Sequence, residues 1–255
     1  MPSLIFKLIL LVVLANPANP KPIYPKPTMF TVPIMTYHHI ESHRGIYYVA
    51  PARFEQQLAY LVAHDYHTVS MDTYANYLEK EEPLPSSPVV LTFDDGYADA
   101  YTTVYPLLKA HHMTGTFYII TGQVGRPGFL TWDEIKEMAA NGMEIGAHTV
   151  THPYLTKLSF IAALQEISGS RVTLENQLGI RITTFAYPYN DHNQMTNLLV
   201  RMAGFRTACI VDFHTGDNVR DYFTIPRYTV SSGESLNVFA LVVNKHGFPS
   251  IPLRR

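Results

Sequence analysis

The sequence predicts an α/β fold built around a largely parallel sheet. From Val32 onward, short segments rich in β-branched and aromatic residues alternate with longer amphipathic segments, which is the pattern of repeated strand–helix units. The chain of 255 residues is close in length to a (β/α) barrel. A doubly wound open sheet is the alternative arrangement. No internal repeat or second linker is visible in the sequence, so we expect one folded domain.

The expected strands are short and are bounded by turn residues. They span Val32–Tyr37, His67–Ser70, Val89–Phe93, Thr114–Ile120, Met143–His148, Thr183–Tyr187, Thr207–Val211 and Thr224–Val230. In a barrel of parallel strands, the chemistry is carried by residues at the C-terminal ends of the strands. The residues that directly follow these segments are therefore the first candidates for a functional site.

Amphipathic segments between the strands predict helices. They span Pro51–Ala63, Trp132–Ala140, Phe160–Leu178, Asn193–Ala203 and Glu234–Asn244. Thr131 and Glu134 have the spacing of a capping box at the start of the second helix. Glycines follow the second, third and fourth segments, as is common after helix C-termini.

The composition excludes several classes of protein. The formal net charge is −2 and only 16% of residues are charged, so the chain offers no basic field for nucleic acid. Cys209 is the only cysteine, which excludes an intramolecular disulfide and a cysteine-based zinc cluster. The chain has twelve histidines. A metal site in this protein would therefore use imidazole and carboxylate ligands.

The N-terminus predicts export. Residues 1–18 contain the apolar run Leu8–Ala15, which is shorter than a membrane span and suits the centre of a signal peptide. An uncleaved N-terminal anchor is the alternative and the one route to a membrane that we expect. Residues 19–28 are rich in proline and favour an extended spacer. The folded domain is then expected at 29–255, in a periplasmic, extracellular or outward-facing anchored protein.

Two adjacent carboxylates directly follow a strand. The segment Val89–Phe93 runs into Asp94, Asp95 and Gly96. Neighbouring carboxylates are unfavourable together unless a cation or a proton separates their roles, and glycine allows a sharp turn that brings both to one pocket. The alternative interpretation is an ordinary polar turn, because Asp-Gly is a frequent turn pair.

Two histidines follow another strand. His148 ends the segment Met143–His148, and His152 comes four residues later. If the chain turns helically there, both imidazoles lie on one face and can bind one metal ion. The alternative is two histidines in a solvated loop. With Asp95 they would make a set of one carboxylate and two histidines, which leaves a coordination position open for water, as in catalytic zinc sites.

These two motifs resemble those of the polysaccharide deacetylases, the carbohydrate esterase family 4 enzymes with a NodB homology domain. Thr92–Tyr97 matches the first motif of that family, and His148–His152 matches the second. The segment Pro33–Ile40 resembles the branch that acts on poly-N-acetylglucosamine. The resemblance extends from about Val32 to Val230.

The resemblance implies a single-domain distorted barrel of seven or eight β/α units and hydrolysis of N-acetyl groups, which are linear amides. It implies that Asp95, His148 and His152 hold a divalent metal, with Asp94 as general base and His38 as general acid. Zn²⁺ is the expected metal, and Co²⁺, Ni²⁺ and Fe²⁺ also suit these ligands. The implied partner is an N-acetylated polysaccharide, and we expect a monomer.

The third motif departs from the family pattern. The family arginine and glycine are absent around Tyr187, Pro188 and Tyr189, the three residues that we expect to contact substrate. The Tyr189 N–H is the expected oxyanion donor, because a backbone donor does not depend on the side chain. Arg227 is the candidate to replace the missing arginine beside Asp94. A purely structural or surface arginine is the alternative.

Two other functions remain open at this point. The same site would suit an O-acetyl esterase acting on xylan-like glycans, because an ester leaves with less help from an acid. The departures in the third motif also allow a catalytically silent glycan-binding domain.

Overall fold

The computed structural model describes residues 32–211 and 221–245. Its strands are β1 (Ile34–Tyr37), β2 (His67–Thr68), β3 (Pro88–Phe93), β4 (Thr116–Ile119), β5 (Glu144–Ala147), β6 (Thr184–Ala186), β7 (Thr207–Val211) and β8 (Ile225–Thr229). All eight expected strands are therefore present, each at or within its predicted segment or one residue longer. The signal peptide or anchor and the spacer expected at 1–28 lie outside the described residues.

The strands close into a parallel barrel. Their order is β1-β8-β7-β6-β5-β4-β3-β2, and β1 also pairs with β3. Ile34 lies beside Val90 and Tyr37 beside Phe93 in that pairing, which joins the two ends of the sheet. Seven strands thus form the ring and β2 is attached to β3 outside it. The barrel, and not the open sheet, is confirmed.

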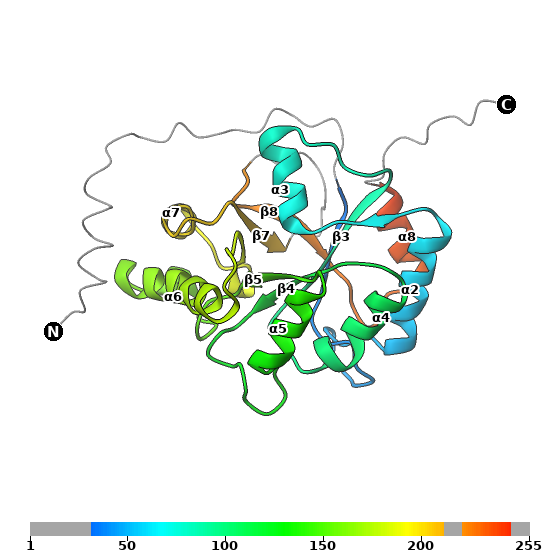
Figure 1. Cartoon of the computed structure of the whole chain (residues 1–255), viewed down its shortest axis with the longest axis horizontal. Helices are drawn as coiled ribbons and strands as arrows, with labels where there is room; N and C mark the ends of the chain where they lie inside the picture. The colour runs from blue at the N-terminus through cyan, green and yellow to red at the C-terminus, as the bar shows by residue number, and fades with distance from the viewer. Residues whose placement is uncertain (1–31, 212–220, 246–255) are drawn as a thin grey trace.

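Helices surround the barrel (Figure 1). They are α2 (Pro51–Ala63), α3 (Met71–Lys80), α4 (Tyr105–Ala110), α5 (Trp132–Ala140), α6 (Phe160–Leu178), α7 (Gln194–Met202) and α8 (Leu236–Lys245), with a π-helical turn at Ala100–Val104 before α4. The five predicted helices agree with the structure within two residues at each end. The capping box of Thr131 and Glu134 is present at the start of α5. α3 and the helical segment 100–110 were not predicted from the sequence.

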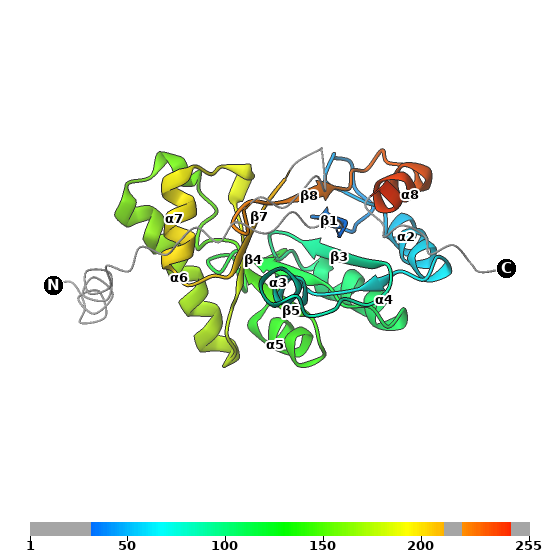
Figure 2. The same cartoon turned by 90° about the horizontal axis from the view of Figure 1, so that it is seen from above.

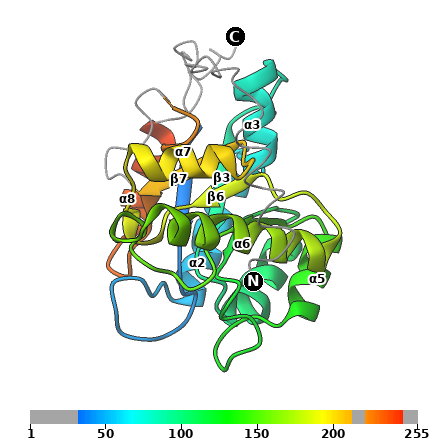
Figure 3. The same cartoon turned by 90° about the vertical axis from the view of Figure 1, so that its left-hand side faces the viewer.

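Two pairs of helices pack on opposite sides of the barrel. α2 contacts α8, and α6 contacts α7. Figure 2 shows these two pairs at opposite ends of the molecule, and Figure 3 shows α7 and α6 side by side in front of the strands. In the part of the chain that the structure describes, no helix is both long and apolar enough to cross a membrane.

A stacked aromatic core supports the strands that carry the first motif. The rings of Tyr37 and Phe93 stack with centroids 5.4 Å apart, and Phe93 stacks on Phe117 at 4.8 Å. The β3 residues are buried along the whole strand, as expected for a parallel strand covered on both faces. This packing fixes the C-terminal end of β3, where Asp94 and Asp95 follow.

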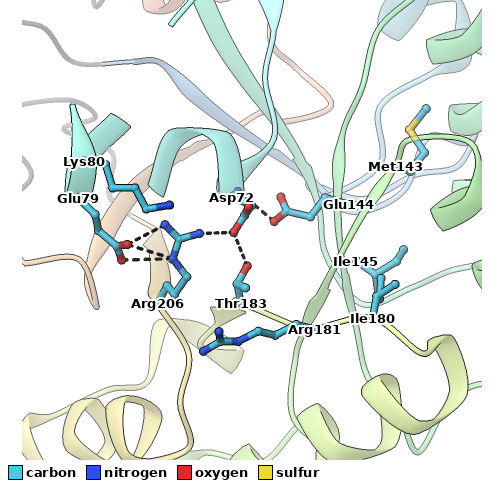
Figure 4. Close-up of a pocket in the computed structure, with 10 residues that line it drawn as sticks. All are labelled: Asp72, Glu79, Lys80, Met143, Glu144, Ile145, Ile180, Arg181, Thr183 and Arg206. Atoms are coloured by element: carbon cyan, nitrogen blue, oxygen red, sulfur yellow. Dashed lines mark hydrogen bonds and ion pairs between the residues drawn. The ribbon is translucent and has the colours of Figure 1, made fainter. Parts of the chain in front are cut away.

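The opposite end of the barrel holds a polar pocket of about 690 Å³ (Figure 4). Arg206, which precedes β7, donates to Asp72 and Glu79 on α3. Glu144 at the start of β5 accepts hydrogen bonds from the N–H groups of Met71 and Asp72, at 2.7 and 3.0 Å. These contacts join α3 to the N-terminal ends of the strands, far along the strand direction from the two sequence motifs.

Candidate active site

The predicted site residues come together at the C-terminal end of the barrel. His38 follows β1, Asp94 and Asp95 follow β3, and His148 follows β5. Because these strands are parallel, the residues after their C-terminal ends share one end of the barrel. Segments that are far apart in the sequence thus supply one cluster of acidic and imidazole groups.

Asp95, His148 and His152 form a three-residue cluster with metal-ligand chemistry. Asp95 Oδ1 lies 3.4 Å from His148 Nε2 and 3.4 Å from His152 Nε2, and the two Nε2 atoms are 3.2 Å apart. One ligand atom from each residue lies within 4.8 Å of the others. One carboxylate oxygen and two imidazole nitrogens that converge in this way suit a divalent metal such as zinc.

The tautomer of His148 is set by the neighbouring strand. His148 Nδ1 lies 2.8 Å from the carbonyl oxygen of Ala186, the last residue of β6. A carbonyl oxygen only accepts, so Nδ1 carries the proton and donates it. The lone pair of neutral His148 is then on Nε2, the atom that faces Asp95. Metal-binding histidines are usually oriented by such a second hydrogen bond.

The loop between the two histidines is held by α6. Glu166 on α6 accepts hydrogen bonds from the N–H groups of Val150 and Thr151 at 2.9 and 2.8 Å. Its other carboxylate oxygen accepts from the Thr151 hydroxyl at 2.7 Å. The His152 N–H donates to the Thr149 hydroxyl at 3.0 Å. These bonds fix the turn that returns His152 toward His148.

The site contains non-glycine residues in left-handed backbone conformation. The φ angle is 74° at Asp95, 63° at His152 and 56° at Tyr189. Such residues cost about 1–3 kcal/mol each and persist where the surrounding structure holds them. Their presence at three positions of one site indicates that the fold places these side chains at the expense of local backbone energy.

Asp94, which adjoins the metal-ligand cluster, has a partner of its own. Both its oxygens accept from Arg227, with NH1 and NH2 each at 2.8 Å. Arg227 NH1 also donates to the Thr92 hydroxyl at 3.1 Å, and the guanidinium carbon lies 5.1 Å from the centre of the Tyr118 ring. Arg227 is 1% exposed. The surface position considered as an alternative for Arg227 is therefore wrong.

His38 lies within electrostatic range of the same groups. Burial lowers the pKa of His38, while the charges of Asp94 and Asp95 act in the opposite direction. The ring of Tyr47 is 4.5 Å from the ring of His38. The buried Nδ1 atom of His38 has no hydrogen-bond partner among the described residues. No hydrogen bond to Nδ1 therefore fixes the tautomer of this ring in the part of the chain that the structure describes.

The third-motif segment forms a turn after β6. Tyr187 and Pro188 are buried, and Tyr189 is 55% exposed. In the described part of the chain, the Tyr189 N–H has no acceptor. Its ring lies 4.4 Å from the ring of His152. Tyr189 is therefore the member of this segment whose side chain borders the metal-ligand cluster on the solvent side.

Comparison with known proteins identifies the family. The family described as "Polysaccharide deacetylase" matches residues 81–208, which contain both the Asp pair and the two histidines. The chain belongs to the polysaccharide deacetylase family. The expectation drawn from the two motifs is confirmed.

Relatives of this deacetylase share most of its length. It is 28% identical over 200 residues to the poly-β-1,6-N-acetyl-D-glucosamine N-deacetylase of Staphylococcus aureus, which covers 72% of this chain and 68% of that protein. The structure of the Streptococcus pyogenes deacetylase PplD in complex with acetate matches with a TM-score of 0.79 and 26% identity, over 88% of this chain and all of that one. IcaB of Ammonifex degensii gives 0.75 and 25%, over 84% and 97%.

The electrostatics of the candidate site keep its carboxylates ionised. Burial alone would raise the pKa of Asp94, but the Arg227 guanidinium lowers it overall. Burial would likewise raise the pKa of Asp95, but the hydrogen bond and charge of His148 hold it well below its usual range. Burial and the neighbouring His148 lower the pKa of His152 to about 4. Neutral His152 is the form that binds a metal.

Several residues that support the candidate site were not predicted from the sequence. They are the Ala186 carbonyl, Glu166 and Asp191, which accepts from the Thr156 N–H and hydroxyl at 2.7 and 2.8 Å. None of them belongs to a local motif, because each acts on a segment at least 15 residues away. Only the assembled fold shows these contacts.

Proposed function

We propose that this chain is a metal-dependent N-deacetylase that hydrolyses N-acetyl groups of a poly-N-acetylglucosamine-type polysaccharide. One observation carries the proposal. Asp95 converges with His148 and His152, while the adjacent Asp94 is engaged separately by Arg227. Two neighbouring carboxylates with different partners can serve as metal ligand and general base, which resolves their mutual repulsion.

The donor set fits a divalent metal that binds neutral imidazole and carboxylate. Asp95, His148 and His152 would hold it, and Zn²⁺ suits these ligands, as do Co²⁺, Ni²⁺ and Fe²⁺. When bound, such an ion polarises the acetyl carbonyl and lowers the pKa of water. The hydrogen bond from His148 to the Ala186 carbonyl keeps Nε2 available as the ligand atom.

Asp94 is the proposed general base. Arg227 holds its carboxylate in one plane through two hydrogen bonds and keeps it ionised. An ionised and oriented carboxylate can take a proton from the water that attacks the acetyl carbon. Arg227 thereby has the role proposed for the arginine that the third motif lacks, and it acts through Asp94.

Tyr189 and His38 are assigned to the oxyanion charge and to the leaving nitrogen. The Tyr189 N–H, which has no acceptor in the described chain, is the proposed donor to the developing oxyanion. His38 is the proposed general acid, because a glucosamine nitrogen leaves as an amine only when it receives a proton. The solvent-side position of Tyr189 supports its assignment to substrate contact. Tyr187 and Pro188, whose side chains are buried, would act there by shaping the turn.

The substrate assignment rests on the relatives. The Staphylococcus aureus relative is a poly-β-1,6-N-acetyl-D-glucosamine N-deacetylase, and the PplD structure holds acetate, the second product of such a reaction.

We propose that this chain acts as an exported monomer on a polymer outside the cytoplasm. The apolar segment near the N-terminus supports export.

Acetate release tests the proposal. Full-length protein supplied with Zn²⁺ is incubated with β-1,6-linked and β-1,4-linked N-acetylglucosamine oligomers and with acetylated xylan. We expect acetate from an N-acetylated oligomer, loss of release on chelation, and recovery on addition of metal. Release from acetylated xylan alone would show an O-acetyl esterase. Binding of oligomers by metal-loaded protein without acetate release would show a silent glycan-binding domain, and either result contradicts the proposal.

A further inference from the structure

Two tyrosines stack on the solvent side of the metal-ligand cluster. The rings of Tyr154 and Tyr189 are 4.2 Å apart between centroids and inclined by 16°. Although they pack together, Tyr154 is 46% exposed and Tyr189 is 55% exposed. Lys157 Nζ lies 4.4 Å from the centre of the Tyr154 ring. The result is a row of one cation and two aromatic rings that begins beside His152 and extends into solvent.

The row is built on two adjoining segments that hold it in place. Tyr154 and Lys157 follow β5, and Tyr189 follows β6, the neighbouring strand of the barrel. Asp191 joins the segments, because both its oxygens accept from Thr156. Side chains fixed in this way lose little conformational freedom when a ligand binds, which favours affinity.

The exposed rings are not explained by packing of the core. Large aromatic side chains contribute most when they are buried, and exposed apolar patches beside a polar site commonly mark ligand contacts. A sugar ring presents C–H groups that pack on aromatic carbon, and hydroxyl groups that suit a tyrosine hydroxyl or a lysine ammonium. The chemistry of the row therefore matches a pyranose unit.

The strand order fixes which side of the site the row occupies. β5 and β6 are separated from β1 by at least two strands in both directions around the ring. The row therefore lies across the barrel mouth from His38, which follows β1. A sugar whose acetamido group lies between Asp94 and His38 would have its neighbour in the chain on the side of Tyr189 and Tyr154.

We propose that Tyr154 and Lys157, together with Tyr189, form a subsite for the sugar unit next to the one that is deacetylated. This inference rests on the proposed function for the identity of the sugar. Tyr154 and Lys157 would contact this neighbouring sugar, and neither is placed among the groups that carry the reaction. The subsite makes the protein favour chains over single N-acetylglucosamine units.

Calorimetric titration tests the subsite apart from the reaction. Full-length protein freed of metal by chelation is titrated with N-acetylglucosamine and with its β-1,6-linked tetramer, so that binding is measured without acetate release. We expect the tetramer to bind more tightly than the monomer. Tyr154→Ala should weaken tetramer binding by about fivefold and leave monomer binding unchanged, since an aromatic contact contributes about 1 kcal/mol.

Matched variants separate the subsite from a general effect on folding. Tyr154→Phe keeps the stacked ring and should lose less than twofold, and Lys157→Met should lose less than Tyr154→Ala. Phe160→Ala on the first turn of α6 removes a ring that is 42% exposed, and it should bind as the unaltered protein does. Equal tetramer affinity in Tyr154→Ala and the unaltered protein would overturn the proposal.

A second outcome would also overturn it, namely unaltered protein that binds the tetramer no better than the monomer. Acetate release by the metal-loaded protein is scored separately. Length-dependent binding that requires Tyr154, in a protein that releases no acetate, would refute the proposed function and leave the subsite standing.

Discussion

Arg227 and Asp94 form a bidentate ion pair across the barrel, although 133 residues separate them in the sequence. NH1 and NH2 each lie 2.8 Å from one carboxylate oxygen, and both side chains are buried. Paired N–H groups in a plane define the orientation of a carboxylate as well as its charge. β8 thereby supplies the cationic partner of Asp94, the role in which we propose that Arg227 replaces the arginine absent from the third motif.

Removing Arg227 should lower both stability and activity. Arg227→Met leaves Asp94 buried without its partner, and the loss of one partner of a buried pair costs about 3–5 kcal/mol of unfolding free energy. Urea unfolding measures this loss. Lys80→Met is the control, because Lys80 pairs with Glu82 on the surface and its removal should cost less than about 1 kcal/mol. Equal losses of unfolding free energy in the two variants would show that the buried pair contributes no more to stability than the surface pair does.

His38 should matter more for amides than for esters. His38→Gln removes the proposed proton donor, and general acid catalysis typically contributes about 10²–10⁴-fold. We expect kcat for acetate release from an N-acetylglucosamine oligomer to fall within that range. Hydrolysis of an aryl acetate ester should fall far less, because that leaving group departs without a proton. A parallel fall on both substrates would assign His38 a different role.

Glu166 should control metal affinity without touching the metal. It holds the loop between His148 and His152 through two backbone N–H groups, and loss of such outer contacts typically weakens metal binding about 10–100-fold. We expect Glu166→Ala to raise the Kd for Zn²⁺ by an amount in that range, measured by competition with a chelator. Glu55→Ala on α2 is the control and should bind as the unaltered protein does. Unchanged affinity in Glu166→Ala would contradict this role.

Glu144 should make the stability of the protein depend on pH. Burial raises the pKa of Glu144 to about 7, and its hydrogen bonds, led by that from Thr116, only partly offset this. The folded state therefore binds a proton more tightly than the unfolded state. The associated stability is present below the unfolded pKa and is lost as pH rises through the folded pKa. Between pH 5 and 8 the free energy of unfolding should fall by roughly 2–3 kcal/mol from this group.

Urea unfolding at pH 5, 6, 7 and 8 checks the Glu144 effect. Other groups titrate in this range, so the informative quantity is the difference between the unaltered protein and Glu144→Gln, which cannot titrate there. The unaltered protein should lose stability relative to the variant as pH rises. An identical pH dependence of the two proteins would show that Glu144 is ionised throughout.

The strands and most helices could be predicted because their signals are local. Val89–Phe93 reads as a buried strand from its composition alone, and Thr131 with Glu134 defines a helix start. The barrel was expected from the length and from the family resemblance, but the strand pair that closes it could not be predicted, since the pairing of β1 with β3 joins residues about 56 positions apart. The helix α3 was missed although its signals are present, with Ser70 as N-cap and Met71, Tyr74 and Leu78 on one buried face.

The residues of the candidate site also divide into those with a local signal in the sequence and those without one. Asp95, His148 and His152 stand in two compact motifs, and the structure brings them together. Arg227 was proposed only because the family arginine is absent from the third motif. Nothing in the sequence indicated its contact with Asp94. Glu166 had no local signal, because its role depends on α6 packing beside the loop after β5. The residues that carry the chemistry could thus be predicted from the sequence, whereas the residues that hold them in position could not.

The most direct test separates the two adjacent carboxylates. Zn²⁺ content and acetate release are measured together on the unaltered protein, Asp94→Asn and Asp95→Asn. We predict that Asp94→Asn retains one equivalent of Zn²⁺, which also shows that it is folded, and releases no acetate. Asp95→Asn should lose both. Acetate release by Asp94→Asn at the unaltered rate, or full Zn²⁺ binding by Asp95→Asn, would contradict the assignment of Asp94 as base and Asp95 as metal ligand.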